Sequence, residues 1–116
     1  MLIAAMKALV LESYKSFAFR DFEEPVPRDD EALIRVRACA ICGSDVHGMD
    51  GTSGRRIPPI VMGHEASGVI ERPAKGSRFA AGTPVTFDST VWCGACAYCR
   101  QGRVNLCEDR RVLGVS

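Results

Sequence analysis

Trp92–Cys107 reads WCGACAYCRQGRVNLC, and this stretch decides how the chain around it folds. It holds four cysteines in the spacing C-x2-C-x2-C-x7-C: Cys93, Cys96, Cys99 and Cys107. Steps this short bring four sulfur atoms from one loop onto a small sphere, as a tetrahedral metal ion requires. Zn²⁺ binds thiolates at about 2.3 Å, and a site with four protein ligands is closed. We therefore expect a structural zinc lobe over residues 91–108.

Two other uses of these cysteines are possible. Six cysteines in a small secreted protein would suggest three disulfides, but nothing else in the sequence indicates secretion. The spacing C-x2-C-x2-C also opens the iron–sulfur motif of bacterial ferredoxins, where the fourth cysteine follows after three residues and precedes proline. Here it follows after seven and precedes Glu108. The spacing favours zinc, with iron as the alternative, and zinc binding would contribute about 10 kcal/mol or more to folding.

Composition excludes several classes of partner. The 116 residues contain 15 Lys and Arg against 14 Asp and Glu, a net charge of +1. This balance gives no electrostatic case for nucleic acid or an anionic membrane as a partner. No run approaches the ~18 apolar residues of a membrane span, and the apolar residues 1–11 lack the basic start of a signal peptide. Free thiols fit a reducing compartment, so we expect the cytoplasm.

Short strand patterns separated by turn residues fill most of the chain. Residues 31–40 alternate in polarity, which predicts a half-buried strand with Val36 on its buried face and Cys39 on the other, as a spare thiol. Further strands are expected over residues 1–11, 17–20 and 85–87. Residues 60–62 lead to the glycine-bracketed turn at residues 63–68, from which another strand is entered. With almost no long amphipathic helix, this predicts a mainly β fold, a barrel or sandwich.

Two loops interrupt the strands. Residues 24–30 are charged and broken by prolines, so they cannot form a central strand. Residues 49–59 are rich in glycine and proline and carry Arg55 and Arg56, which predicts an exposed, mobile loop. Before that loop, Ser44 or Asp45 could cap a short helix.

Cys42 and the pair His64-Glu65 lie in different turns, each flanked by glycine. Each is a residue type that zinc takes as a ligand. A lone cysteine is usually a small buried apolar residue and a lone histidine a structural one, so those interpretations stay open. If the two turns share a metal, coordination positions remain for water or substrate, and an open zinc polarises a bound oxygen.

Three polar residues beside Cys42 could serve such a site. Asp45 could orient the ligand histidine. Ser44 and His47 could pass a proton from the bound oxygen to solvent. The alternatives are helix capping for Ser44 and Asp45 and a surface histidine for His47.

Residues 42–47 (CGSDVH), residues 63–68 (GHEASG) and the cysteine quartet, in this order and spacing, resemble the zinc-dependent medium-chain alcohol and polyol dehydrogenases. Threonine and sorbitol dehydrogenases belong to this group. The resemblance covers nearly the whole chain. It implies that residues 1–116 are the GroES-like catalytic domain of such an enzyme, a partly open barrel with short helices and a zinc-binding lobe.

Carried over by residue, the resemblance implies one catalytic and one structural zinc. Cys42 and His64 match catalytic ligands, and Glu65 matches a carboxylate that can approach that metal. The cysteine quartet matches the structural site. In the family, the remaining catalytic ligand lies at the start of the region after this domain.

The same resemblance implies a chemistry and a cofactor. Asp45 matches the partner of the ligand histidine, Ser44 the hydroxyl that takes the proton of a zinc-bound alcohol, and His47 the end of that relay. Family members oxidise alcohols or polyols by zinc-alkoxide formation and hydride transfer to NAD(P), which a Rossmann domain binds. No Gly-x-Gly-x-x-Gly fingerprint occurs in these residues. We therefore expect an N-terminal fragment, inactive alone, of an enzyme that is a homo-oligomer at full length.

One position departs from the family, which usually has Gly-Asp-basic-Val where residues 82–85 read GTPV. Pro84 lacks an N–H donor, so we expect weaker strand pairing there.

Other functional classes remain as alternatives. The main one is a stand-alone zinc-stabilised binding or assembly module without catalysis. A zinc ribbon that binds nucleic acid would need a basic face, and the arginines around residues 100–111 are more often a solvated surface. Zinc-free quinone reductases share the barrel, but this chain has both zinc motifs.

Overall fold

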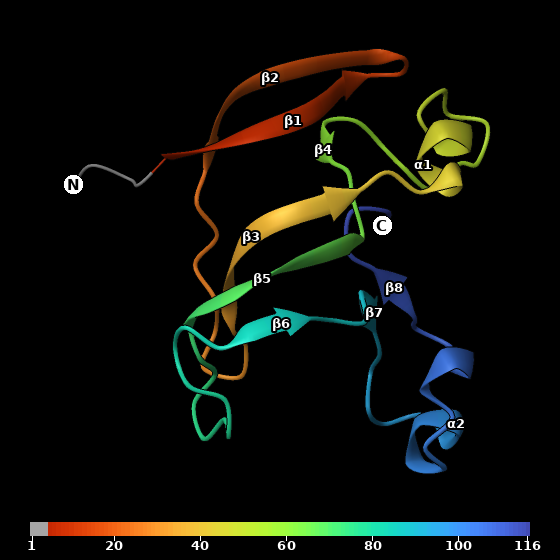
Figure 1. Ribbon diagram of the computed structural model, residues 1–116. Helices are drawn as coiled ribbons and strands as arrows, with labels where there is room; N and C mark the ends of the chain where they lie inside the picture. Colours follow the sequence, from red (N-terminus) through yellow and green to blue (C-terminus); the bar gives the residue numbers. More distant parts are fainter. Residues whose placement is uncertain (1–4) are drawn as a thin grey trace.

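The computed structural model describes residues 5–116 as a chain of short strands with a few short helices (Figure 1). The mainly β prediction is confirmed, and the predicted N-terminal strand is present from Ala5 onward, while its residues 1–4 lie outside the described part. The strands are β1 (Ala5–Ser13), β2 (Ser16–Glu23), β3 (Leu33–Ala40), β4 (Ile60–Val61), β5 (Glu65–Arg72), β6 (Pro84–Thr86), β7 (Thr90–Val91) and β8 (Arg111–Val112). The helices are α1 (Gly43–Gly48), α2 (Ala97–Arg100) and the 3-10 turn η1 (Val104–Leu106).

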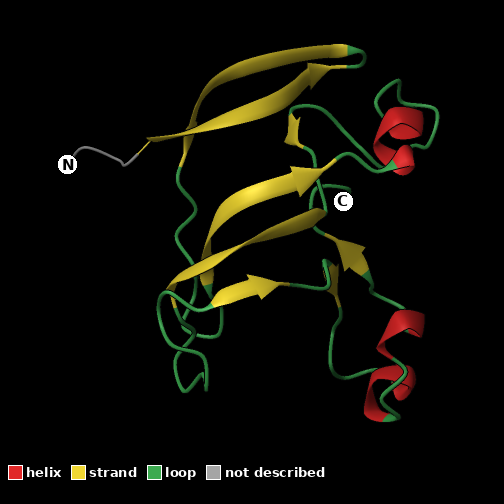
Figure 2. Cartoon of the chain, viewed as in Figure 1, coloured by secondary structure: helices red, strands yellow, loops and turns green. Residues whose placement is uncertain are grey.

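The first sheet has the order β2-β1-β4, and it holds the best-buried side chains. Val10 and Leu11 in β1 are fully buried, and they pair across the sheet with Val61 and Ile60 of β4. Because β4 follows the loop of residues 49–59, this pairing holds the end of that loop beside β1. Figure 2 shows the loop as a green segment between α1 and β4.

The second sheet has the order β3-β5-β6, so β3 is an edge strand. The predicted buried face of residues 31–40 is wrong for most of this strand: Val36 is 53% exposed, and Ala38 and Ala40 are also exposed. The pairing with β5 shifts register between Val36 and Ala38. The alanines border an open groove, described below, and face no packed layer within residues 5–116.

Pro84 is the first residue of β6, the other edge strand of this sheet, and pairs with Val69. Proline is tolerated at the first residue of an edge strand, where its missing N–H interrupts no ladder. The expected weakening is therefore limited, and the strand forms over three residues.

The third sheet closes the cysteine-rich segment. β7 and β8 pair antiparallel, with Thr90 opposite Val112, and the Leu113 N–H donates to the Ser89 carbonyl at 3.0 Å. The segment between the two strands carries α2 and η1 and extends away from the other two sheets (Figure 1). A two-stranded neck thus fixes both ends of this lobe.

The segment between β3 and β4 differs from prediction in two ways. Helix α1 is capped by Cys42 rather than by Ser44 or Asp45, and Asp45 accepts a hydrogen bond from the Cys42 N–H at 3.1 Å. The loop of residues 49–59 is exposed at residues 52–55 but not at Arg56, whose exposed fraction is 3%. A buried ion pair with Asp45 explains this difference. Among residues 5–116, no helix is long and apolar enough to cross a membrane.

Candidate metal centres

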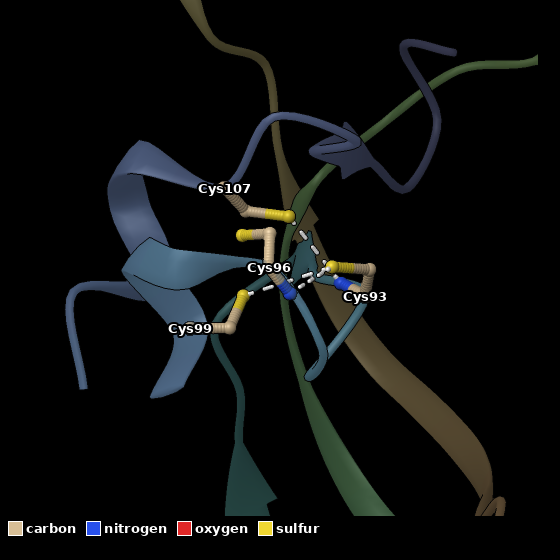
Figure 3. A group of neighbouring side chains, drawn as sticks. All are labelled: Cys93, Cys96, Cys99 and Cys107. Atoms are coloured by element: carbon tan, nitrogen blue, oxygen red, sulfur yellow. Dashed lines mark hydrogen bonds between the residues drawn. The ribbon is translucent and has the colours of Figure 1, made fainter. Parts of the chain in front are cut away.

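The cysteine lobe brings its four sulfur atoms together, as Figure 3 shows. All lie within 4.8 Å of one another, and the Sγ atoms of Cys93 and Cys99 are 4.0 Å apart. Cys93 lies two residues after the end of β7, Cys96 caps α2 and Cys99 lies within it, and Cys107 precedes β8 by a few residues. The paired strands β7 and β8 and the short helix α2 therefore bring sulfur atoms from both ends of the lobe close together.

Backbone N–H groups surround these sulfurs. The Cys96 and Ala95 N–H groups donate to Cys93 Sγ at 3.3 and 3.4 Å, and the Cys93 N–H donates to Cys107 Sγ at 3.3 Å. Hydrogen bonds of this kind stabilise a thiolate. Such bonds to Cys93 lower its pKa, and bonds from the Cys99 and Glu108 N–H groups lower the pKa of Cys96 to about 6.

The fourth thiol shows the opposite effect. The pKa of Cys99 is raised to about 12, chiefly by desolvation; hydrogen bonds with the neighbouring sulfurs also raise it, and the Gly94 N–H lowers it. Four thiols this close cannot all ionise without a cation between them. A divalent cation with a preference for sulfur removes that conflict, so the donor set fits zinc.

A second cluster joins residues from two distant turns. Cys42 caps α1, and His64 and Glu65 lie where the chain enters β5; their ligand atoms are all within 4.8 Å of one another. The pairing of β3 with β5, with Ala40 opposite Glu65, brings the two turns together. Cys39 belongs to neither cluster and is a free, exposed thiol.

Ser44 and Asp45 lie beside this second cluster. Ser44 Oγ is 3.3 Å from Cys42 Sγ and 3.5 Å from His64 Nε2. Asp45 Oδ1 is 3.5 Å from His64 Nδ1, on the other side of the imidazole ring. His47 is exposed on the same helix, and its main-chain carbonyl oxygen lies 3.2 Å from Thr52 Oγ1.

The histidine provides a test of whether the cluster suits a metal. His64 Nδ1 is buried and has no partner with hydrogen-bond geometry among the described residues, although Asp45 lies 3.5 Å away. A cation on Nε2 would place the ring hydrogen on Nδ1, facing this carboxylate. Sulfur, nitrogen and oxygen donors together suit zinc. The residues present therefore fit a zinc ion held through Cys42, His64 and Glu65.

Arg56 is the residue at this site that sequence reasoning missed. Its Nη2 atom donates to Asp45 Oδ1 at 3.0 Å and to Ser44 Oγ at 3.2 Å. No residue-type signal separates it from its exposed neighbour Arg55. Only the position of the loop against α1 distinguishes the two arginines.

A groove of about 560 Å³ opens beside the second cluster. His64 and Glu65 lie on its wall, together with residues of β3, β5 and the segment that follows β6. The lining residues are Ala38, Ala40, His64, Glu65, Ala66, Ser67, Thr86, Phe87, Asp88 and Ser89. A ligand in this groove would reach the candidate metal site from the side of the second sheet.

Comparison with known proteins identifies relatives of the whole arrangement. The family model of the alcohol dehydrogenase GroES-like domain matches residues 28–115. D-arabitol-phosphate dehydrogenase of Enterococcus avium is 40% identical over 103 residues, which are 87% of this chain and 29% of that protein. Sorbitol dehydrogenase of Halalkalibacterium halodurans is 38% identical over 113 residues, 94% of this chain and 33% of that protein.

Comparison with solved structures also finds alcohol dehydrogenases. An alcohol dehydrogenase, rspB, of Escherichia coli CFT073, solved in complex with NADH, superposes with a TM-score of 0.84 at 36% identity, covering 96% of this chain and 32% of that one. The chain thus spans about a third of the length of the relatives it matches. From the matched domain and from relatives that align along nearly all its length, the chain belongs to the zinc-dependent medium-chain alcohol dehydrogenase family, of which it carries the GroES-like domain.

Proposed function

We propose that residues 1–116 are the N-terminal catalytic domain of a zinc-dependent, NAD(P)-linked dehydrogenase that oxidises a secondary alcohol or polyol. The observation that carries this proposal is the meeting of Cys42, His64 and Glu65, from separate turns, with the Ser44 hydroxyl between the thiol and the imidazole. A closed structural site has no use for a hydroxyl at that place, whereas a catalytic one does.

Each residue of the cluster has a role in this proposal. Cys42 and His64 hold the catalytic zinc, Glu65 approaches it as a further carboxylate, and Asp45 keeps the His64 ring in position. When bound, the zinc would supply Lewis-acid polarisation of the alcohol oxygen. Ser44 accepts the alcohol proton.

His47 completes the proton path. It lies three residues after Ser44 on α1, a spacing that puts both side chains on one face of a helix. Both residues are exposed, so a proton that reaches the His47 ring passes directly to solvent. When bound, NAD(P)⁺ would supply the acceptor for the hydride of the alcohol carbon, so that the product is a ketone or aldehyde.

The remaining parts of the proposal concern the whole protein. The four-thiolate lobe, residues 91–108, holds a second, structural zinc. A Rossmann domain outside residues 1–116 binds NAD(P), because the matched relatives are about three times as long as this chain. The full-length enzyme is a cytoplasmic homo-oligomer, and the isolated 116 residues do not turn over.

The test uses the full-length protein with a panel of secondary alcohols and polyols and with NAD⁺ or NADP⁺. We expect turnover by the wild type and none by Cys42→Ala, because the catalytic zinc loses a ligand. Cys39→Ala is the matched control, since Cys39 lies in neither cluster. Near-normal turnover of Cys42→Ala would contradict the assignment. A wild type that holds zinc but oxidises no substrate would instead support a binding or assembly module.

A further inference from the structure

The guanidinium of Arg56 is buried at the candidate catalytic site, where no established function requires it. Its side chain is 3% exposed, while the neighbouring Arg55 is exposed. Arginine stays charged in proteins, so burying it is costly unless a partner of opposite charge accepts its hydrogen bonds. The partner is Asp45, whose side chain is 9% exposed and lies 3.0 Å away.

Helix α1 makes room for this side chain. A Cβ atom on Gly48, the last residue of the helix, would lie 2.3 Å from Arg56 Nη1 and 2.9 Å from Cδ. Any side chain at position 48 would therefore displace the guanidinium. The loop that follows α1 returns to this helix, so that Arg56 packs against Gly48. The absence of a side chain at Gly48 leaves the space that the guanidinium fills.

The hydrogen bonds of Arg56 go to catalytic-site side chains. One nitrogen, Nη2, donates to Asp45 Oδ1 and to Ser44 Oγ, while Nε is buried with no partner among the described residues. If Arg56 only held the loop in place, we would expect its guanidinium N–H groups to donate to main-chain carbonyl oxygens. Here Nη2 instead donates to the side chains of Ser44 and Asp45, which lie on either side of the His64 ring.

This arrangement restricts the orientation of the Ser44 hydroxyl. A guanidinium has donors only, so Ser44 Oγ must accept in its bond with Arg56. The Ser44 hydrogen can point to Cys42 Sγ at 3.3 Å or His64 Nε2 at 3.5 Å. A metal ion bound to those two atoms would take up their lone pairs, and the hydrogen would then turn toward solvent. Negative charge builds up on this oxygen as its own proton leaves, and a positive charge 3.2 Å away stabilises it. The oxygen then accepts the incoming proton.

We propose that Arg56 is a positioning residue for proton transfer: it holds the Ser44 hydroxyl at the metal cluster and stabilises the charge that develops on its oxygen. In the transfer, the Ser44 O–H bond breaks and its proton leaves to solvent by way of the exposed His47, so negative charge develops on Oγ. The O–H bond of the alcohol breaks as its proton forms the new O–H bond at Ser44 Oγ. Arg56 itself gains and loses no proton. This role rests on the proposed dehydrogenase function.

The test compares Arg56→Gln with Arg55→Gln in the full-length protein. We expect Arg56→Gln to lower kcat by about 10- to 100-fold with little change in KM, because a charge-assisted hydrogen bond that matters in the transition state is lost. Arg55→Gln should leave kcat unchanged. The solvent deuterium isotope effect on kcat should rise in Arg56→Gln only, since proton transfer becomes more rate-limiting. Millimolar guanidinium, but not sodium chloride, should restore part of the activity.

Zinc content and melting temperature separate this role from a structural one. We expect Arg56→Gln to retain the zinc content of the wild type. If it folds poorly, Arg56→Lys, which keeps the charge on a shorter stem, and Gly48→Ala, which only displaces the guanidinium, replace it. Arg56→Lys should keep more activity than Arg56→Gln, because it keeps the charge. The proposal is overturned if Arg56→Gln and Gly48→Ala keep the wild-type kcat and isotope effect, or if lost activity only follows lost zinc. A wild type inactive on every alcohol would overturn the proposed dehydrogenase function itself.

Discussion

Gly114 lies directly against the peptide of Gly63: a Cβ atom on Gly114 would fall 2.1 Å from the Gly63 carbonyl oxygen. Gly63 immediately precedes His64, and Gly114 follows β8, the strand that closes the cysteine lobe. One backbone contact therefore connects the neck of the lobe to the turn that carries the candidate catalytic histidine. Packing this close is open only to glycine.

We expect Gly114→Ala to weaken metal binding at the second cluster. The new methyl group overlaps the Gly63 carbonyl, so the turn before His64 must shift, at a cost of about 1–3 kcal/mol beyond the backbone strain. The measurement is zinc stoichiometry by native mass spectrometry of the full-length protein, together with its melting temperature.

The matched control for that substitution is Gly76→Ala. Gly76 has a φ of 75°, close to the 70° of Gly114, but a Cβ atom on it would meet nothing within 4 Å. Both variants carry the left-handed strain of about 1–2 kcal/mol, and only one carries the clash. Equal zinc content and equal stability in the two variants would show that the contact between Gly114 and Gly63 is not tight in solution.

Removing the proposed structural zinc should unfold the lobe while the first sheet persists. The unfolded chain has no preformed site, so the metal contributes about 10 kcal/mol or more to the folded lobe. Cys99→Ser should lower the zinc content by one and speed hydrogen exchange in α2 and η1, but not in β1. Cys39→Ser, a change at a thiol outside both clusters, should do neither. Slow exchange in α2 after zinc removal would contradict the prediction.

Leu11→Ala should destabilise the first sheet strongly. Leu11 is fully buried in β1, and truncating a buried leucine to alanine typically costs about 2–5 kcal/mol. Leu9→Ala, on the same strand but 53% exposed, should cost far less. Hydrogen exchange of the β1 and β2 amides measures the difference. Similar protection in both variants would place the core elsewhere.

Thr52→Val should raise the pKa of Asp50. The Thr52 hydroxyl and N–H donate to Asp50 Oδ1 at 2.7 and 2.9 Å, and these bonds, the hydroxyl first, lower the Asp50 pKa below its usual 3.8. Because the Asp50 pKa is lower in the folded state, the ionised carboxyl stabilises the fold at pH values above the unfolded-state pKa. This stabilisation is lost as the pH falls through the folded-state pKa. NMR titration of the carboxyl carbon checks the shift. Ser53→Ala, which removes no bond to Asp50, should leave it unchanged.

Much of the fold follows from local sequence. Alternating residues, turn glycines and the absence of a long amphipathic pattern predicted short strands, and the structure confirms them. The spacing of the cysteine quartet predicted a compact lobe because ligands a few residues apart in one loop meet by local geometry alone. The same reasoning fails at β3: alternation marks two faces but does not state whether another layer covers either one.

The sequence by itself determined which residue types are present and in what order: the quartet of the lobe, Cys42 before His64, and the turns that carry them. Only the tertiary structure decided which distant groups meet. Pairing of β3 with β5 brings Cys42 to His64, and the return of the loop to α1 buries Arg56 while Arg55 stays exposed. The physical reason is that such contacts depend on strand register and on space left by glycines, which no local pattern of residues specifies.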